Sequence, residues 1–547
     1  MKGIRTLALA GALGAALAGA LCSADATSAA AAGTSRASVG TNGEQAQYGN
    51  SYAPMVSATG RFIAFESTAL YLADGINSAQ HIYLRDREAP LTERISVSSA
   101  ETLGNYGSLH GTVSADGRFV AFQSQATNLV TPATVFARFH IYLRDRQEGT
   151  TILVSAPPGG GEGNQHSSWP AITPDGRYIA FASAASNLTA PPGNGYQQIL
   201  RYDRSTGEII TVSLGDDGQQ AGAACYHPSI SDDGNLVAFH VAADLDAQVP
   251  AGGFNVFVRD IAAAETRLVS VNAAGDHGGN THSTNPAISG DGSHVAFESL
   301  ATDLVGVPGN GHPQIYLRDL AAGANYRASA APDGTQGNSY SMNPAINGDG
   351  SAVAFESNAS NLVEDINGRV DIFVYRHGAP PVIERVSVRD ESVLGPGEPP
   401  DANAQSWLAA IDAGGLITAF ESWSTDLVAD DTNGVADIFV RESDPVAVDP
   451  ALIPAPLGLS AWPNPLRGGA GVRLSVALPE DTAIRAAVYD VAGRSVRVLA
   501  SGSRPAGQGI LHWDGRDERG QAAPAGVYVL RLGAGERSAA HKLVLLP

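Results

Sequence analysis

The chain has 547 residues and a formal net charge of −21, with 62 glycines, 31 prolines and only 16% charged residues. This length is sufficient for at least two domains, and the composition favours many short strands and turns over long helices. Residues 451–547 carry 11 Lys/Arg against 7 Asp/Glu, a net charge of +4, which leaves −25 for residues 1–450. Because so acidic a surface repels polyphosphate, the sequence argues against a nucleic-acid partner.

Residues 1–26 have the pattern of a secretory signal peptide. Lys2 and Arg5 precede an apolar run that ends near Leu21, and Ala24-Asp-Ala26 provides small residues for cleavage. A lipid anchor on Cys22 is the alternative, but the preceding leucine is bulky where a lipobox has a small residue. No other run approaches the roughly 20 apolar residues of a membrane span. We therefore expect an exported protein with no transmembrane segment after signal cleavage.

A unit of four short strands recurs seven times between residues 34 and 445. In residues 285–299, Asp291-Gly292 joins two alternating strands at a dipeptide that suits a tight hairpin turn. The second strand ends in Ala-Phe in every unit, at intervals of 57, 59, 58, 58, 58 and 65 residues: Phe65, Phe122, Phe181, Phe239, Phe297, Phe355 and Phe420. A glycine closes the first hairpin of every unit: Gly60, Gly117, Gly176, Gly234, Gly292, Gly350 and Gly415.

Seven four-stranded units without intervening helices predict an all-β fold, a seven-bladed β-propeller. Unit seven stops at Asp437–Glu442 and lacks the fourth strand that unit one has at Thr92–Val97. A segment of the missing type lies before unit one, at Thr34–Val39. We predict that Thr34–Val39 pairs with unit seven near Ile438–Val440, because this closure removes two exposed sheet edges.

The pattern Pro-x-Ile-Ser-x-Asp-Gly-x-x-Val-Ala-Phe resembles the WD-repeat-like units of the TolB-type propeller family, found in secreted and periplasmic bacterial proteins. The resemblance covers about residues 34–442 and implies the fold, but propellers host many unrelated functions. Units one and seven depart most from the pattern, with Thr59-Gly60 and Gly414-Gly415 in place of Asp-Gly.

Residues 446–459 are a connector rich in proline and alanine, and residues 460–547 are predicted to form an Ig-like β-sandwich of about seven strands. Strands are expected at 473–478, 484–489, 496–499, 526–531 and 542–546. The segments 462–465, 488–494, 513–517 and 525–528 resemble the FlgD-type Ig-like module and the C-terminal sorting domain of type IX secretion cargo. This resemblance implies that the tail engages secretion machinery and serves export or surface attachment.

Two loops carry spaced oxygen-bearing side chains, namely Asp365, Asn367 and Asp371 in unit six and Asp431, Asn433 and Asp437 in unit seven. Such groups suit Ca²⁺, but this ion needs at least about six oxygen ligands and each loop offers three. Asn-Gly is also a turn former, and asparagine occupies the same place in units that lack the aspartates: Asn77, Asn194 and Asn310. We therefore interpret both loops as turns, with calcium as the alternative, and expect no cofactor.

Cys225 lies three residues before Pro228, and serine takes the equivalent place in the other six units: Ser51, Ser108, Ser167, Ser283, Ser341 and Ser406. We interpret it as a small packing group, since a reactive thiol needs an environment that lowers its pKa. The sequence contains no Gly-x-Ser-x-Gly, His-Glu-x-x-His, P-loop or dinucleotide-binding motif. No catalytic residue is expected.

These observations favour an exported, non-enzymatic binding or scaffold protein that presents a propeller surface to an unknown protein or glycan ligand. One alternative is a propeller-based extracellular enzyme, a glycan-active hydrolase or lyase, which would need convergent acids on the ring. A structural role in the cell envelope is another. The expected location is the periplasm in transit, then the medium or the outer cell surface. Function is expected where the repeat symmetry fails.

Overall fold

The computed structural model describes residues 33–443, except 71, 74–78, 136–137, 244, 246–252, 364–366, 379 and 396–397. It also describes residues 458–546, except 463–465, 468–471, 479–481, 491–493, 505–506 and 535–536. The predicted signal peptide and residues 446–457 of the predicted connector lie outside the described residues. No helix within the described residues is long and apolar enough to span a membrane.

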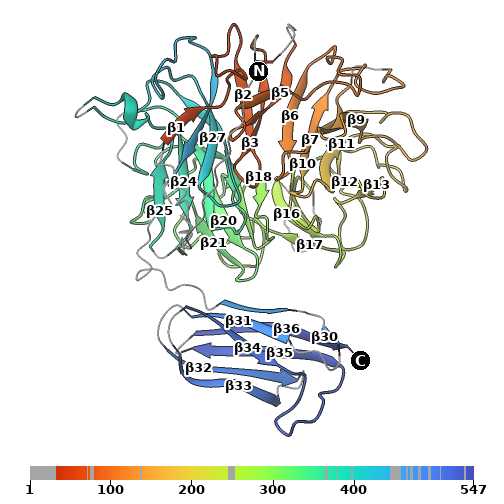
Figure 1. Ribbon diagram of the computed structural model, residues 1–547, viewed down its shortest axis with the longest axis vertical. Coiled ribbons are helices and arrows are strands. Elements are labelled where there is room, and N and C mark those ends of the chain that lie inside the picture. The colour runs from red at the N-terminus through yellow and green to blue at the C-terminus, as the bar shows by residue number, and fades with distance from the viewer. Residues whose placement is uncertain are drawn as a thin grey trace, which may run out of the picture.

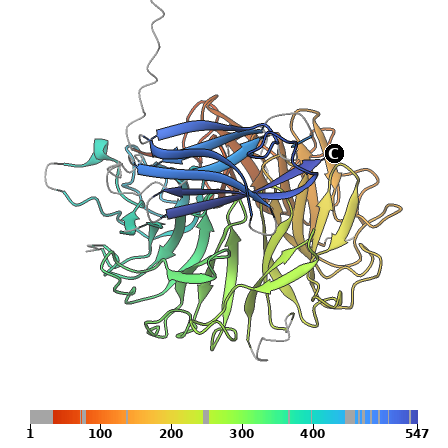
Figure 2. The same cartoon turned by 90° about the horizontal axis from the view of Figure 1, so that it is seen from below.

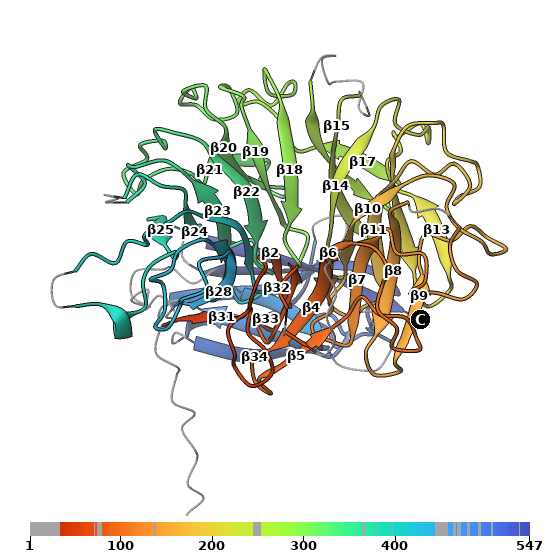
Figure 3. The same ribbon diagram turned by 90° about the horizontal axis from the view of Figure 1, so that it is seen from above.

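Seven four-stranded antiparallel sheets surround a common axis and form a seven-bladed β-propeller (Figure 3). In each of blades one to six the strands follow chain order, from the inner strand at the axis to the outer strand. Blades one to three consist of β2 (Ser51–Val56), β3 (Phe62–Ser67), β4 (His81–Asp86), β5 (Leu91–Arg94); β6 (Ser108–Val113), β7 (Phe119–Ser124), β8 (His140–Asp145), β9 (Thr150–Leu153); β10 (Ser167–Ile172), β11 (Tyr178–Ser183), β12 (Gln198–Asp203) and β13 (Glu208–Thr211).

The remaining blades repeat this design, and the longer seventh unit contains a single 3-10 turn, η1 (Glu391–Val393). Blades four to seven consist of β14 (Cys225–Ile230), β15 (Leu236–Val241), β16 (Asn255–Asp260), β17 (Glu265–Leu268); β18 (Ser283–Ile288), β19 (His294–Ser299), β20 (Gln314–Asp319), β21 (Ala324–Arg327); β22 (Ser341–Ile346), β23 (Ala352–Ser357), β24 (Asp371–Arg376), β25 (Val382–Arg385); β26 (Ser406–Ile411), β27 (Ile417–Ser422), β28 (Asp437–Glu442) and β1 (Gly33–Arg36).

The conserved spacing of the units follows from how neighbouring blades pack. Phe62 and Ala64 of blade one lie in one buried cluster with Val120 and Phe122 of blade two. The hairpin glycine contributes to the same contact. Gly117 has φ +70, and a Cβ atom there would lie 2.6 Å from the ring of Phe62. Glycine is therefore required both by the left-handed turn and by the approach of the preceding blade.

The ring is closed by the N-terminal strand, as predicted from the incomplete seventh unit. β1 pairs antiparallel with β28, with Thr34 opposite Arg441 and Arg36 opposite Phe439 (Figure 1). The strand is shorter than predicted, because Ser38 replaces the ladder with a side-chain hydrogen bond. Its hydroxyl accepts from the Ile438 amide at 3.0 Å. All seven blades thus have four strands.

The tail forms two packed sheets (blue in Figure 1 and Figure 2), one ordered β29-β31-β34 and the other β30-β36-β35-β32-β33. Their bounds are β29 (Gly458–Trp462), β30 (Leu466–Arg467), β31 (Val472–Leu478), β32 (Thr482–Asp490), β33 (Ser495–Arg504), β34 (Gly507–Trp513), β35 (Gly526–Ala534) and β36 (Arg537–Leu546). All five strands expected from the sequence are present. β29, β30 and β34 were not among them, because proline and glycine in and around these segments gave them the composition of loops.

Candidate functional site

One residue on the inner strand of each blade adopts a left-handed backbone conformation beside the central axis. The seven residues have φ between +46° and +52°, and none is glycine: Ala53, His110, Trp169, His227, Asn285, Asn343 and Leu408. We call this set the channel ring. At each member the register of the inner strand shifts against the second strand, so the ring is a circle of seven β-bulges.

The channel ring stores backbone strain at chemically varied residues. A left-handed conformation costs about 1–2 kcal/mol for a residue with a Cβ atom, and asparagine tolerates it best. Only two ring members are asparagine, whereas Trp169 and Leu408 are bulky. Such strain persists where the surrounding structure enforces it, and it gathers at functional sites. The side chains of the ring are therefore the first place to look for recognition.

Six of the seven bulges are held by a side chain from the second strand of the preceding blade. The His110 amide donates to Glu66 Oε1 at 2.7 Å, and the Trp169 amide donates to Gln123 Oε1 at 2.9 Å. The Leu408 amide likewise donates to Glu356 Oε2 at 2.9 Å. For His227, the equivalent position in the preceding blade is Ala182, whose side chain offers no acceptor. The repeat symmetry therefore fails between blades three and four.

Blades four to six present a connected set of polar side chains to the channel. The Nδ1 atom of His227 lies 2.5 Å from Asn285 Oδ1, and Asn285 Nδ2 lies 3.4 Å from Asn343 Oδ1. Carboxyl groups of the half-buried Glu298 and the buried Glu356 fix both amides from behind. Asn285 Nδ2 donates to Glu298 at 3.1 Å, and Asn343 Nδ2 donates to Glu356 at 3.0 Å. These bonds orient the amides before any ligand arrives.

An aromatic cluster adjoins these polar groups in blades three and four. The Trp169 ring meets the His227 ring edge-on with centroids 4.4 Å apart, and Tyr226 lies 6.2 Å from Trp169. Behind them, Nδ1 of His240 accepts a hydrogen bond from the backbone amide of Asn285 at 3.3 Å. Burial lowers the pKa of His240 to about 3, with a smaller contribution from His227. His240 is therefore neutral at pH 7.

The carboxyl groups behind the ring are unusually basic. Burial raises the pKa of Glu66 and of Glu421 to about 7, and it also raises the pKa of Glu298 and Glu356. Glu66 shares blade one with Ala53, and Glu421 shares blade seven with Leu408. The side chains of these two ring residues offer the glutamates no hydrogen bond. Since Glu356 and Glu66 also repel the Glu421 charge, the channel disfavours further negative charge.

The channel ring surrounds a cavity of about 420 Å³. Blades two to six give its wall imidazole, indole and amide groups, whereas blades seven and one give Leu408, Ala53 and Met55. Leu408 and Met55 are 38% and 42% exposed, so the apolar side is open to solvent. The wall also includes small and aliphatic residues such as Ala287, Ile288 and Ile411. The part of the cavity that the channel ring lines, which we call its mouth, is therefore polar on one side and apolar on the other.

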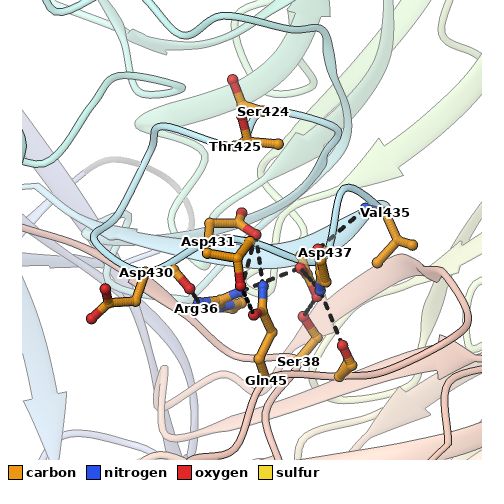
Figure 4. Close-up of polar contacts among 12 residues, drawn as sticks. Arg36, Ser38, Gln45, Ser424, Thr425, Asp430, Asp431, Val435 and Asp437 are labelled. Atoms are coloured by element: carbon orange, nitrogen blue, oxygen red, sulfur yellow. Dashed lines mark hydrogen bonds and ion pairs between the residues drawn. The ribbon is translucent and has the colours of Figure 1, made fainter.

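In the unit-seven loop, an arginine lies between Asp431 and Asp437, two of the three candidate calcium ligands. Arg36 Nη1, from the N-terminal strand, lies 3.2 Å from Asp431 Oδ1 and 3.5 Å from Asp437 Oδ2 (Figure 4). Asn433 Oδ1 accepts from the Val435 amide at 3.2 Å, and its Nδ2 donates to Asp437 Oδ2 at 2.8 Å. Asn433 thus shapes a turn, and a single guanidinium from within the chain contacts both carboxyl groups.

The loop of unit six repeats this geometry. Asn367 Oδ1 accepts from the Arg369 amide at 2.7 Å, and Asn367 Nδ2 donates to Asp371 Oδ2 at 2.9 Å. Arg385 Nη1 lies 3.7 Å from the same carboxylate. Asp365 lies outside the described residues, as does Asn77. Within the described residues, no three His, Cys, Asp or Glu side chains are arranged to hold a metal ion. The contacts favour the turn interpretation.

Cys225 occupies a buried structural position at the start of blade four. In the other six blades the serine at this place hydrogen-bonds a serine on the second strand, as in Ser51–Ser67 at 3.1 Å and Ser283–Ser299 at 2.8 Å. Blade four replaces both members, so that Cys225 faces Val241. Burial raises the pKa of the thiol to about 12. The thiolate that a nucleophile requires is therefore absent at neutral pH.

The channel ring was missed in the sequence, although a signal was present. Its members come directly before the repeated proline in five units, at Pro54, Pro170, Pro228, Pro286 and Pro344. That position changes its chemistry from unit to unit, while the residue after it is proline in five units and the residue two positions before it is serine in six. The residue before a proline normally adopts an extended conformation, so the inward-facing bulge was not expected.

Comparisons with known proteins agree with the two-part architecture. The FlgD Ig-like domain family matches residues 464–537. The solved structure of a putative TolB from Agrobacterium tumefaciens has 18% identity and a TM-score of 0.33, covering 51% of this chain and 80% of its own. The RRP9 WD40 repeats have 11% identity and a TM-score of 0.39, covering 75% and 97%.

A third solved structure is PorZ, an essential bacterial surface component of the type-IX secretion system of Porphyromonas gingivalis. It has 11% identity and a TM-score of 0.28, covering 90% of this chain and 75% of PorZ. No curated protein matches the chain. The seven sheets themselves establish the β-propeller, and the family match at residues 464–537 is to the FlgD Ig-like domain.

Proposed function

We propose that this protein is an exported, non-enzymatic binding protein whose recognition site is the mouth of the central channel. The observation that carries the proposal is the channel ring, in which one strained backbone position per blade places five different residue types around a single cavity. A purely structural ring would use glycine or asparagine throughout, since these residues adopt the conformation at least cost. Recognition by side chains explains the tryptophan, the histidines and the leucine.

The chemistry of the channel supports binding over catalysis. The oxygens of the glutamates that surround it accept hydrogen bonds from backbone amides of the next blade, as Glu66 does from His110. The buried thiol of Cys225 is protonated at neutral pH. A glycan-active enzyme remains the alternative, since Glu66 and Glu421 have pKa values near those of a general acid. These two groups do not line the cavity wall.

The C-terminal module supports a role at the cell envelope. Its match to the FlgD Ig-like domain covers residues 464–537, and PorZ, which resembles the chain in fold only, is itself a bacterial surface component. We infer that the tail serves export or surface attachment, with type IX secretion as the specific route. Deleting residues 460–547 in the native host tests this inference. A truncated protein that still reaches the surface or the medium at the normal level would contradict it.

The binding role is tested with arrays of immobilised neutral glycans, anionic glycans and peptides, probed with the labelled full chain. The channel is filled by Ala53→Trp, a substitution that the ring accommodates because Trp169 has the same backbone conformation. The control is Val307→Asn on an exposed loop, where the side chain is 64% exposed. We expect Ala53→Trp to abolish the array signal and the control to retain it.

Two outcomes would contradict the proposal. If the Ala53→Trp variant binds as well as the wild type, the site does not lie in the channel. If mass spectrometry shows that the captured ligand is cleaved by the wild-type protein, the enzymatic alternative is correct.

A further inference from the structure

The channel mouth carries the chemistry of a saccharide site. We propose that the polar arc, which consists of His110, Trp169, His227, Asn285 and Asn343, binds an uncharged saccharide. A pyranose ring lies against Trp169, and its hydroxyls are directed at His227 and at the side-chain amides of Asn285 and Asn343. This inference rests on the proposed binding function and adds to it the class of ligand.

The cavity wall points first to a ligand without charge. None of the residues that line the cavity is Asp, Glu, Lys or Arg. The carboxyl groups lie one layer behind and hold the bulge amides and the asparagines, as Glu298 and Glu356 do. An anionic ligand would have no cation to pair with and would face this layer of acids. A phosphate, a sulfated sugar or a sialylated sugar is therefore disfavoured.

The wall points second to a ligand rich in hydroxyl groups. His227, Asn285 and Asn343 form one hydrogen-bonded series, with distances of 2.5 Å and 3.4 Å between successive side chains. Each amide oxygen has two lone pairs, and the second imidazole nitrogen of His227, Nε2, takes no part in this series of hydrogen bonds. Alternating donors and acceptors of this kind match vicinal hydroxyls, each of which both donates and accepts. Because the acids behind fix the amides, little side-chain entropy is lost on binding.

The third element is a flat apolar surface beside these polar groups. Trp169 lies between His110, at a centroid distance of 6.3 Å, and His227, at 4.4 Å. A pyranose has an apolar face of C–H groups and a rim of hydroxyls, so an indole next to amides and an imidazole is complementary to both. The cavity of about 420 Å³ falls within the usual range of small-ligand sites, about 300–1,000 Å³.

An extended peptide is the main competitor, and the backbone of the ring disfavours it. A peptide that adds to a sheet needs a continuous strand edge for main-chain hydrogen bonds. Every inner strand is interrupted at the ring by its bulge, as at Trp169 between Ser168 and Ala171. No blade therefore offers an unbroken edge to the channel. Side-chain recognition of a compact ligand is the mode that remains.

The ring itself supplies substitutions that preserve the fold. Trp169→Asn and His227→Asn each introduce a residue that Asn285 and Asn343 already place in this backbone conformation. Val307→Asn, on an exposed loop away from the cavity wall, is the control. Binding is measured with the full chain against cellotriose, chitotriose, maltotriose and mannotriose, with 3′-sialyllactose and a sulfated heparin disaccharide as charged counterparts. The readouts are isothermal titration and the fluorescence of the five tryptophans.

We expect at least one neutral trisaccharide to bind saturably and to change the tryptophan fluorescence, with no binding of the charged sugars. Trp169→Asn should abolish both signals, and His227→Asn should weaken binding at least about tenfold. Val307→Asn should change affinity by less than about threefold. The melting temperatures of the two ring variants should stay close to that of the wild type, since asparagine suits the ring conformation.

The outcomes separate the ligand class from the proposed function. If peptides bind the array and Ala53→Trp abolishes that signal while no neutral sugar binds, the saccharide inference is wrong and the channel site stands. If a neutral sugar binds equally well to Trp169→Asn, the polar arc is not its site. If neither sugars nor peptides respond to any channel variant, both the inference and the proposed function fail.

Discussion

Arg36 Nη1 lies 3.2 Å from Asp431 Oδ1, so the first strand of the propeller neutralises a buried carboxylate of the last blade. The Arg36 side chain is 9% exposed and that of Asp431 is 1% exposed. Asp437, at 3.5 Å, shares the same guanidinium. The ring is thus closed by a short strand pairing together with the ion pairs of Arg36.

We predict that Arg36→Ala destabilises the propeller by about 3–5 kcal/mol, because it leaves two buried carboxyl groups without their cation. The free energy of unfolding in urea at pH 7 measures the effect. The control is Arg61→Ala, since Arg61 pairs with Asp86 but its side chain is 38% exposed. The control should have a much smaller effect. Equal effects of the two substitutions would show that the ion pairs of Arg36 do not stabilise the closed ring.

Cys225 and Val241 replace a serine pair that the other six blades share. We predict that Cys225→Ser alone costs within about 1 kcal/mol of stability, since the new hydroxyl faces a valine. The double variant Cys225→Ser with Val241→Ser should recover stability relative to the sum of the two single variants, because it restores the pair. A double-mutant cycle from denaturant unfolding tests this coupling. A coupling energy of zero would contradict it.

The thiol should also be inert in the folded protein. Cys225 is fully buried, and burial raises the pKa of its thiol to about 12. Labelling with a bulky maleimide at pH 7 should therefore be negligible until the protein is unfolded in urea. Rapid labelling of the native protein would show that blade four opens locally.

Glu421 should make the propeller less stable as the pH rises. Its folded pKa of about 7 lies above the ordinary value of a glutamate, so its contribution is present at low pH and is lost as the pH rises through about 7. Glu421→Gln mimics Gln123, which already holds the next blade at the equivalent place. We predict that this variant gains stability over the wild type on the order of 2 kcal/mol at pH 8, and little at pH 5.

Unfolding in urea across pH 5–8 measures this difference. The matched control is Glu88→Gln, since the Glu88 side chain is 69% exposed. A stability gain from Glu421→Gln that does not change with pH would contradict the prediction.

Trp513 is the centre of the tail's core. It is 1% exposed, its ring centroid lies 5.3 Å from that of Tyr528, and its Nε1 donates to the Arg516 carbonyl at 3.0 Å. We predict that Trp513→Ala destabilises the tail by about 3–5 kcal/mol and leaves the propeller intact. Calorimetry should show the tail transition move while the propeller transition stays. The control is His512→Ala on the exposed neighbour. A single transition that shifts as a whole would show that the two parts do not unfold separately.

Most of the fold could be predicted because the repeat encodes it redundantly. Gly117 marks a turn and a blade contact at once, and the Ala-Phe pairs mark the buried second strands. The incomplete unit seven also predicted the partner of Thr34–Val39. The tail was harder, since β34 begins with Gly507-Gln-Gly509, which has the composition of a loop although it pairs with β31.

The candidate site could not be predicted, because its position depends on backbone geometry that the residue types conceal. Trp169 and Leu408 are poor indicators of a left-handed bulge, and only their shared place before the unit's proline or small residue connects them. The aspartates drew attention instead. Asp371 and Asp437 belong to a repeated structural pair, in which the first residue of the third strand bonds a serine two residues after the fourth strand, as in His81–Ser96 at 2.9 Å and Ser387–Asp371 at 2.6 Å.

The closing strand also constrains when the molecule can become native. The hydrogen bond between Ser38 and the Ile438 amide joins residues 400 positions apart. Synthesis therefore has to deliver almost the whole propeller before its first strand finds a partner, and until then both ends of the array expose unpaired edges. Such distant contacts form slowly. We expect the ring to be completed only after the chain has left the ribosome.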